Sequence, residues 1–377
     1  MSEVITPPSP ASDEALRVLQ VCNACRYCEG LCATFKSMTE RRDFATTDLD
    51  HLANVCHNCS ACFYDCQYAP PHEFAINVPV ALTELRLETY QRYAWPAGLA
   101  RVLARHGVLA VSLMGTGLAA VLLAAVALSG DSLLVSHTGP GAFYQVMGHG
   151  VMVVVALATF GFSLCAMLVS GRRYWRAIRT RPPTWQGWRR GLGAALSLEN
   201  LDGGHGLGCE VAEQQPSQLR RTFHHFTMWG FLLCFAATLV ATLYHYVLGE
   251  VAPYAFTSWP VVLGTLGGLG LIVGPLGLLW VKTRMDPQVL SGAQVSMDNG
   301  LLASLLFISI TGLLLLVLRE TPAMGVLLLI HLGFVFALFI TLPYGKFVHG
   351  LYRVLALVEV HKVVSHKTRE GQYREKL

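Results

Sequence analysis

The sequence has few charged residues for a chain of 377: Asp, Glu, Lys and Arg together make up only 14% of it. Hydrophobic residues make up 53%, and the mean hydropathy is +0.46. A soluble protein rarely buries that much apolar surface, so the composition argues against a soluble globular protein and indicates a membrane protein. The formal net charge of +4 is small for this length and gives no reason to expect a nucleic-acid partner.

Three signals of other protein classes are missing. The first fifteen residues, Met1 to Ala15, lack an apolar core, so we expect no signal peptide. The apolar stretches do not alternate with polar positions, which argues against a transmembrane β-barrel. The segment Asp202-Gly-Gly-His205-Gly-Leu-Gly-Cys209 is not a dinucleotide fingerprint, because no strand precedes it. We expect a flexible loop there, with a contact surface for another domain or a partner as the weaker alternative.

Long apolar stretches fill the chain after residue 95. A spanning helix needs about 20 apolar residues. Six stretches qualify to within a few residues: His106 to Leu128, Val146 to Val169, His225 to Leu248, Trp259 to Val281, Leu301 to Leu318 and Gly325 to Phe347. The sequence therefore predicts a bundle of about six transmembrane helices.

Basic residues are concentrated on one side of these stretches. They stand between the second and third stretches, after the fourth and in the C-terminal segment. The joints after the first, third and fifth stretches hold almost none, apart from Arg319. By the positive-inside rule, both termini lie in the cytoplasm. The basic residues on the cytoplasmic side are Arg172, Arg173, Arg176, Arg179, Arg181, Arg189, Arg190, Arg220, Arg221, Lys282, Arg284, Arg353, Lys362, Lys367, Arg369, Arg374 and Lys376.

Eight of the eleven cysteines form two runs of identical spacing near the N-terminus. The runs are Cys22-x2-Cys25-x2-Cys28-x3-Cys32 and Cys56-x2-Cys59-x2-Cys62-x3-Cys66. Three thiolates at three-residue steps surround one corner of a 4Fe–4S cluster, and the fourth thiolate of such a run reaches the other cluster. The predicted ligand sets are therefore Cys22, Cys25 and Cys28 with Cys66, and Cys56, Cys59 and Cys62 with Cys32.

Zinc is the alternative occupant of these runs, but a zinc site uses four ligands in two pairs, and these runs carry too many closely spaced thiolates. The usual proline after the fourth cysteine is missing, because Ala33 and Gln67 stand there. The residues between the runs suffice for short helices, which favours a helical ferredoxin-like module. Cys165 and Cys234 lie inside predicted helices and are interpreted as packing residues.

These patterns predict an all-α fold with three parts: a cytoplasmic ferredoxin-like domain over residues 1–95, a transmembrane domain over 96–350, and a basic cytoplasmic tail over 351–377. The transmembrane part includes an Arg-rich cytoplasmic loop over 171–224.

Histidines stand near both ends of two predicted spanning helices. His331 and His349 are 18 residues apart, which is five whole turns of one helix, so both rings would point the same way, about 27 Å apart. His224 and His225 stand at the cytoplasmic end of the third helix, and His245 stands at its outer end. This layout predicts bis-histidine ligation of b-type haem, by His224 or His225 with His349 and by His245 with His331.

Several alternatives stay open at this point. The pattern allows one haem or two. His149, at the outer start of the second helix, is an alternative outer ligand, a quinone-pocket residue or an ordinary interface residue. The histidines as a group can also be polar caps at the membrane surface, in which case the helices only anchor the cysteine-rich domain.

Long motifs in this chain resemble the tricarballylate utilization protein B family, also called the CitB or TcuB family. They are the two cysteine runs, Phe223-His-His225-Phe-Thr-Met-Trp-Gly-Phe-Leu-Leu-Cys234-Phe, Thr242-Leu-Tyr-His245-Tyr246 and Leu342-Pro-Tyr-Gly-Lys346-Phe-Val-His349-Gly-Leu-Tyr-Arg353. The resemblance covers nearly the whole chain. The sixth helix also resembles the last haem-binding helix of the nitrate reductase gamma subunit, where two histidines at the same spacing bind different haems.

The family resemblance implies a role in the inner membrane of a bacterium. A partner flavoprotein similar to tricarballylate dehydrogenase would oxidise a tricarboxylic acid, and this chain would pass electrons from its reduced FAD through the clusters and haem b to quinone. The chain would then be an electron-transfer subunit, without a flavin or nicotinamide fold of its own. The alternatives are a quinol-oxidising subunit that feeds a cytoplasmic reductase, and a haem-free membrane anchor.

Overall fold

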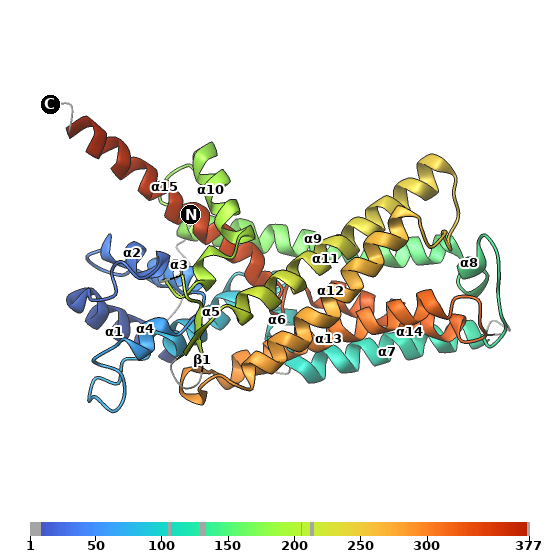
Figure 1. Cartoon of the computed structure of the whole chain (residues 1–377), viewed down its shortest axis with the longest axis horizontal. Coiled ribbons are helices and arrows are strands. Elements are labelled where there is room, and N and C mark those ends of the chain that lie inside the picture. Colours follow the sequence, from blue (N-terminus) through green and yellow to red (C-terminus); the bar gives the residue numbers. More distant parts are fainter. Residues whose placement is uncertain (1–8, 105–106, 129–132, 205, 212–214, 375–377) are drawn as a thin grey trace.

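The computed structural model describes residues 9–104, 107–128, 133–204, 206–211 and 215–374. Its regular secondary structure over these residues is helical, as predicted, apart from a single two-stranded sheet. Figure 1 shows short helices packed together at one end of an elongated molecule and long helices running side by side to the other end. We call residues 9–95 the cysteine domain, and the ends of the bundle near to it and far from it the proximal and distal ends.

The cysteine domain is built from short helices around a common core. Ser9 caps the first helix, because its hydroxyl accepts a hydrogen bond from the Ser12 amide at 3.1 Å, and Pro10 follows at the first helical position. The core includes Leu19, Leu52 and Leu82, all fully buried. The helices are α1 (Pro10–Cys25), α2 (Ala33–Thr39), α3 (Thr46–Val55), α4 (Ala61–Tyr64) and α5 (Val78–Arg92).

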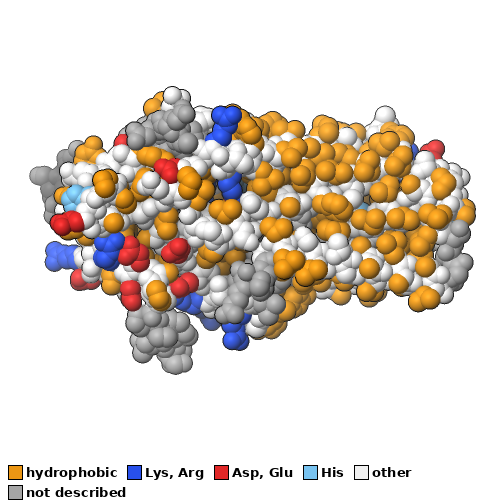
Figure 2. Space-filling view, turned by 90° about the horizontal axis from the view of Figure 1, so that it is seen from below, with side chains coloured by type: hydrophobic (Ala, Val, Ile, Leu, Met, Phe, Trp, Pro, Cys, Tyr) orange, Lys and Arg blue, Asp and Glu red, His pale blue; other side chains and the backbone are white. Residues whose placement is uncertain are grey.

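The prediction of six spanning helices is confirmed among the described residues, with shifted ends. On the face seen in Figure 2, hydrophobic side chains cover most of the bundle, whereas charged side chains gather around the cysteine domain. This is the surface that a bilayer requires. The short helix α6 (Ala97–Ala104) leads into the spans, and α8 (Ala142–Val146) lies at the distal end. The spans are α7 (Gly107–Leu128), α9 (His149–Ile178), α11 with η3 (Leu219–Leu243 and Tyr244–Leu248), α12 (Trp259–Lys282), α13 (Gly292–Val317) and α14 (Met324–Thr341).

Helices α11 and α12 approach closely along a face of small residues. A Cβ atom added at Gly230 would lie 2.9 Å from the Gly267 carbonyl oxygen, and one added at Gly267 would lie 2.8 Å from the Gly230 carbonyl oxygen. Small residues let two membrane helices pack backbone to backbone, where lipid supplies no hydrophobic force between them. This contact holds α11, with its histidines, in a fixed position.

The sixth helix is shorter than predicted. We expected one helix from Gly325 to Phe347 that continued to His349, but α14 ends at Thr341 and α15 (Val348–Arg374) begins after a turn. Pro343 explains the break, because it has no N–H to donate to the preceding turn. His331 and His349 therefore lie on separate helices, and the expectation that five unbroken turns align their rings is wrong.

The segment predicted as an Arg-rich loop is largely folded. It contains α10 (Trp185–Leu196), the turn η1 (Glu199–Leu201) and a hairpin of β1 (Cys209–Val211) and β2 (Gln215–Ser217) that pairs Cys209 with Ser217. Helix α10 packs along α15, and the turn η4 (Pro287–Val289) joins α12 to α13. The described part of the Gly-rich segment contacts the cysteine domain, because a Cβ atom at Gly204 would lie 2.0 Å from the Leu31 carbonyl oxygen. The weaker alternative, a contact surface, is the one that the structure supports.

A buried histidine joins the cysteine domain to α15. His51 is 2% exposed, and its Nε2 atom lies 3.1 Å from the Ala356 carbonyl oxygen. The Arg41 guanidinium donates to its Nδ1 atom at 3.2 Å, so the ring is neutral and donates through Nε2. Burial and the charge of Arg41 lower the pKa of His51 from 6.5 to about 4.

We expect this contact to weaken as the pH falls from 6.5 to 4. The pKa of His51 is lower in the folded protein than in the unfolded chain, so the unfolded chain binds the proton first as the pH falls. The free energy of unfolding therefore keeps its full value above pH 6.5 and declines by about 3 kcal/mol as the buried ring is forced to ionise. Replacing His51 by Gln, which keeps a donor but does not titrate, should flatten this part of the profile. Thermal unfolding of both proteins across this range measures the effect, and parallel profiles would contradict it.

Candidate functional site

The first cysteine cavity lies between the end of α1 and the loop that follows α4. It encloses about 410 Å³ of space between side chains, including the part open to its surroundings. Its walls include Cys22, Cys25, Cys28 and Cys66, which are the members of the first predicted ligand set. Helix α1 ends at Cys25, and Arg26 adopts a positive φ of 56°, which turns the chain so that Cys28 also lines the cavity.

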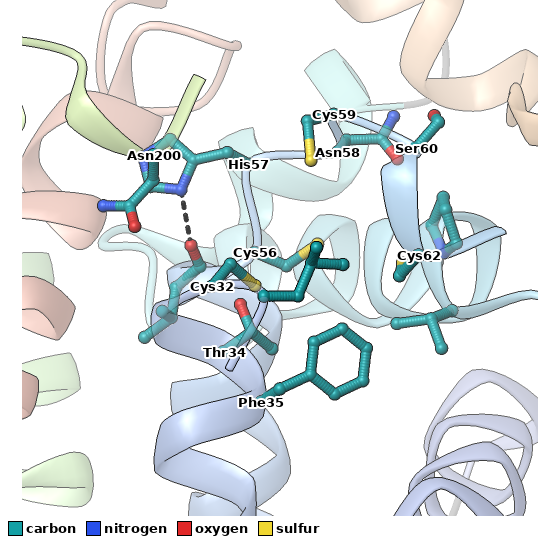
Figure 3. A pocket seen from close by; sticks show the side chains of 14 residues that line it. Cys32, Thr34, Phe35, Cys56, His57, Asn58, Cys59, Ser60, Cys62 and Asn200 are labelled. Atoms are coloured by element: carbon teal, nitrogen blue, oxygen red, sulfur yellow. Dashed lines mark hydrogen bonds between the residues drawn. The ribbon is translucent and has the colours of Figure 1, made fainter. Parts of the chain in front are cut away.

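The second cysteine cavity lies on the other side of Cys62, which lines both cavities. It also encloses about 410 Å³, and its walls include Cys32, Cys56, Cys59 and Cys62, the members of the second predicted set. Figure 3 shows these four side chains around the cavity, with Phe35 and Thr34 of α2 near Cys32. The structure thus brings Cys32 to the second run and Cys66 to the first, as the crossed arrangement requires.

The thiols surround spaces and do not converge on a point. Among the residues that the structure describes, no three His, Cys, Asp or Glu side chains are arranged to hold a single metal ion. This spread arrangement suits a cubane, which needs its four thiolates placed around its own volume. The donor set and the cavities fit 4Fe–4S clusters.

Burial keeps the thiols of Cys22, Cys28 and Cys62 protonated when nothing is bound to them. It raises the pKa of Cys22 to about 12 and that of Cys28 to about 11, and neighbouring thiols add to both shifts. Burial also raises the pKa of Cys62. Thiolates at these positions need a bound cation that takes the place of the protons.

Three arginines hold the loop of the second run: Arg86 of α5, within the cysteine domain, and Arg220 of α11 and Arg353 of α15. Arg86 and Arg353 both donate to the Cys56 carbonyl oxygen, Arg353 at 2.7 Å, and Arg220 donates to the carbonyl oxygens of Asn58 and His57. Arg86 is 2% exposed. Fixed positive charge beside four thiolates stabilises a negatively charged cluster, and stabilises it more after it accepts an electron.

The predicted cytoplasmic histidine pair meets at the proximal end of the bundle. The ring centroids of His224, on α11, and His349, on α15, are 6.1 Å apart. A metal–imidazole bond is about 2 Å long, so two imidazoles on opposite sides of one iron would have their centroids roughly 6 Å apart. The Nδ1–H of His349 donates to the Lys346 carbonyl oxygen at 2.5 Å, which leaves Nε2 free as a ligand atom. The arrangement fits a bis-histidine haem.

His225 follows His224 on α11, and the structure records no ring contact between it and His349. The Nδ1 atoms of His224 and His225 are both buried without a hydrogen-bond partner. The pairing therefore favours His224 over His225 as the partner of His349.

The histidines nearer the distal end are arranged differently from the predicted pairing. His245, in the π-helical turn η3, stacks on His149 with centroids 4.1 Å apart, and Tyr144 lies against both rings. The described contacts of His245 do not include His331. The alternative ligand His149 is thus the residue that meets His245. Rings stacked this closely leave no room for an iron between them, so this pair does not fit a haem as it stands.

His331 lies on α14 against α13. Its Nδ1 atom is 3.1 Å from the Thr311 hydroxyl oxygen, which itself donates to its own helix, so the His331 ring donates to that oxygen. A Cβ atom at Gly312 would lie 2.9 Å from the His331 ring. A small residue there is what allows the ring to fit between the two helices.

Sequence reasoning missed the arginines and one cysteine. Arg220 and Arg353 served only as topology signals, although each lies four residues from a predicted haem ligand, which places both on the same helical face. That spacing was a usable signal. Cys209 is 1% exposed and packs with Leu198 and Leu201 against Cys59. No sequence signal places it there, because the contact depends on how the hairpin folds back.

Comparisons with known proteins agree with this architecture. Residues 15–92 match the family model for the citrate utilization protein B Fer4-like domain, and residues 102–370 match the model for citrate utilization protein B. The citrate utilization protein B of Escherichia coli is 48% identical over 358 residues, which cover 95% of this chain and 93% of that protein. No solved structure matches. The chain belongs to the citrate utilization protein B family, and it is a helical, multi-pass membrane protein with an N-terminal Fer4-like domain.

Proposed function

We propose that this protein carries electrons from the reduced flavin of a partner dehydrogenase, through two 4Fe–4S clusters and one b-type haem, to quinone in a bacterial inner membrane. The partner would oxidise a tricarboxylic acid of the citrate or tricarballylate type, in line with the family name. Oxidation of the reduced flavin releases two electrons and two protons, and reduction of quinone to quinol takes up two of each. Clusters and haem supply one-electron carriers between these two-electron partners.

The observation that carries this proposal is the connection between the second cysteine cavity and the histidine pair. Arg220 lies one turn before His224 on α11, and Arg353 lies one turn after His349 on α15. Both arginines donate to the loop that carries Cys56 and Cys59. The same two helices therefore hold the second ligand loop and present the histidines, which supports a short path between the two centres.

The histidine pair at the proximal end supports one haem. Lys346 fixes the tautomer of His349 through its carbonyl oxygen, and the backbone contact of α11 with α12 fixes His224. A second haem, held by His245 with His149 or with His331, stays a prediction from the sequence. The number of haems per protein, determined from the pyridine haemochrome spectrum, distinguishes the two cases.

The test is anaerobic reduction of the membrane-bound protein by the partner flavoprotein and its substrate. We expect the cluster absorbance to bleach and a reduced b-type haem band to appear, both reversed when a short-chain quinone is added. A control without the flavoprotein should stay oxidised. Reduction by quinol alone, with none by the flavoprotein, would reverse the proposed direction. Zinc in place of iron, or a protein without a haem band, would overturn the relay itself.

A further inference from the structure

A cleft opens between three helices at the proximal end of the bundle. Its lining includes Gly107 and Ala110 of α7, Met297 and Ser304 of α13, Leu338 of α14 and Lys346 of the turn that follows α14. It holds about 450 Å³ of space, including the part open to its surroundings. Gly107 keeps α7 close to α13, since a Cβ atom there would lie 2.7 Å from the Ser296 carbonyl oxygen.

Ser304 is an unpartnered polar group in this apolar wall. The residue is 4% exposed, and its hydroxyl has no hydrogen-bond partner. A buried hydroxyl without a partner costs free energy, which a ligand that accepts its hydrogen bond would recover. The cleft therefore combines an apolar wall with a free donor, which is the usual composition of a site for a small aromatic ligand.

Lys346 brings a second donor to the same cleft. Its Nζ atom lies 2.7 Å from one oxygen of Asp298, and the Nζ atom of Lys282 lies 3.2 Å from the other. Two ammonium groups thus share one carboxylate, and each has hydrogen atoms left over for another acceptor. Lys346 is also the residue whose carbonyl oxygen accepts the hydrogen bond from His349. One turn of chain therefore borders both the cleft and the histidine pair.

We propose that this cleft binds the ring of a quinone, with the ring between α7, α13 and α14 and its carbonyl oxygens toward Lys346 and Ser304. The inference rests on the proposed function and adds the place where the acceptor binds. A quinone suits these residues because it is flat, apolar in its ring and tail, and bears only hydrogen-bond acceptors. A lipid tail would fill the apolar wall but would leave both donors unused.

The test is binding of a fluorescent hydroxyquinoline N-oxide, a quinone-site inhibitor, to the full-length protein in nanodiscs. Ala110→Trp, which fills the cleft, should abolish saturable binding, and Ser304→Ala should weaken it about fivefold through one lost hydrogen bond. The matched controls are Leu113→Trp, an exposed position on the same helix, and Ser309→Ala, a buried and unpartnered hydroxyl on α13 outside the cleft. Both controls should bind like the unmodified protein.

Reoxidation of the chemically reduced protein by a short-chain quinone separates the two possible failures. If the unmodified protein is reoxidised, but the Ala110→Trp and Ser304→Ala variants bind and react like it, the cleft is not the quinone site and the proposed function stands. If the unmodified protein neither binds the inhibitor nor reacts with quinone, the proposed function itself fails. If Ala110→Trp does not fold, the Ser304→Ala and Ser309→Ala pair decides: equal binding by these two would overturn the assignment.

Discussion

Replacing His349 by alanine is expected to remove nearly all of the b-type haem absorbance from the purified protein. The reason is that the ring centroids of His349 and His224 lie 6.1 Å apart, so the loss of one imidazole would leave the iron with a single protein ligand. His224→Ala should have the same effect. The pyridine haemochrome spectrum, divided by the protein concentration, gives the measurement.

The matched control for these variants is His225→Ala, which removes the neighbouring ring on the same helix. It should keep its haem, because the structure pairs His349 with His224. All three variants should keep their iron–sulfur signals if the cysteine domain is intact, which separates haem loss from misfolding. Haem loss in His225→Ala together with full haem content in His224→Ala would reverse the assignment.

Replacing Cys32 by serine should remove the cluster of the second run, and replacing Cys66 by serine should remove the cluster of the first run. Each of these residues belongs by sequence to the other run. Cys32 lines the cavity of the second run and Cys66 lines that of the first, so each variant should lose about four of roughly eight irons per protein. Arg86, Arg353 and Arg220 donate to carbonyl oxygens of the second-run loop, so the two cluster environments differ. The electron paramagnetic resonance spectra of the two variants should therefore retain different signals. Iron analysis measures the loss of iron, and low-temperature electron paramagnetic resonance spectroscopy measures which cluster signal remains.

Cys209→Ser is the control for this pair of variants. Cys209 packs against Cys59 but does not line either cavity, so its replacement should leave the iron content unchanged. If Cys32→Ser and Cys66→Ser each lost the cluster of their own run, the crossed arrangement would be wrong. Full iron content in both would show that neither residue is a ligand.

The length and apolarity of the membrane stretches were enough to find the six spans, since a bilayer sets the same requirement for each. The spacing of the two cysteine runs predicted which thiols share a cluster, and in the structure the four thiols of each predicted set line one cavity. The sixth span was predicted too long because it was carried past Pro343 to Phe347, whereas the helix ends at Thr341. Apolarity therefore located this helix but did not locate its end.

The sequence alone determined what this chain contains: apolar stretches long enough to cross a membrane, and thiols at cluster spacing. Both are local properties, fixed by residue type and by distance along the chain. Only the tertiary structure decided which distant residues meet: His224 with His349, His245 with His149, and Arg220 and Arg353 with the Cys56 loop. Those pairings depend on how whole helices pack and where Pro343 breaks one of them, and helix packing is set by the sum of many weak contacts that no single motif records.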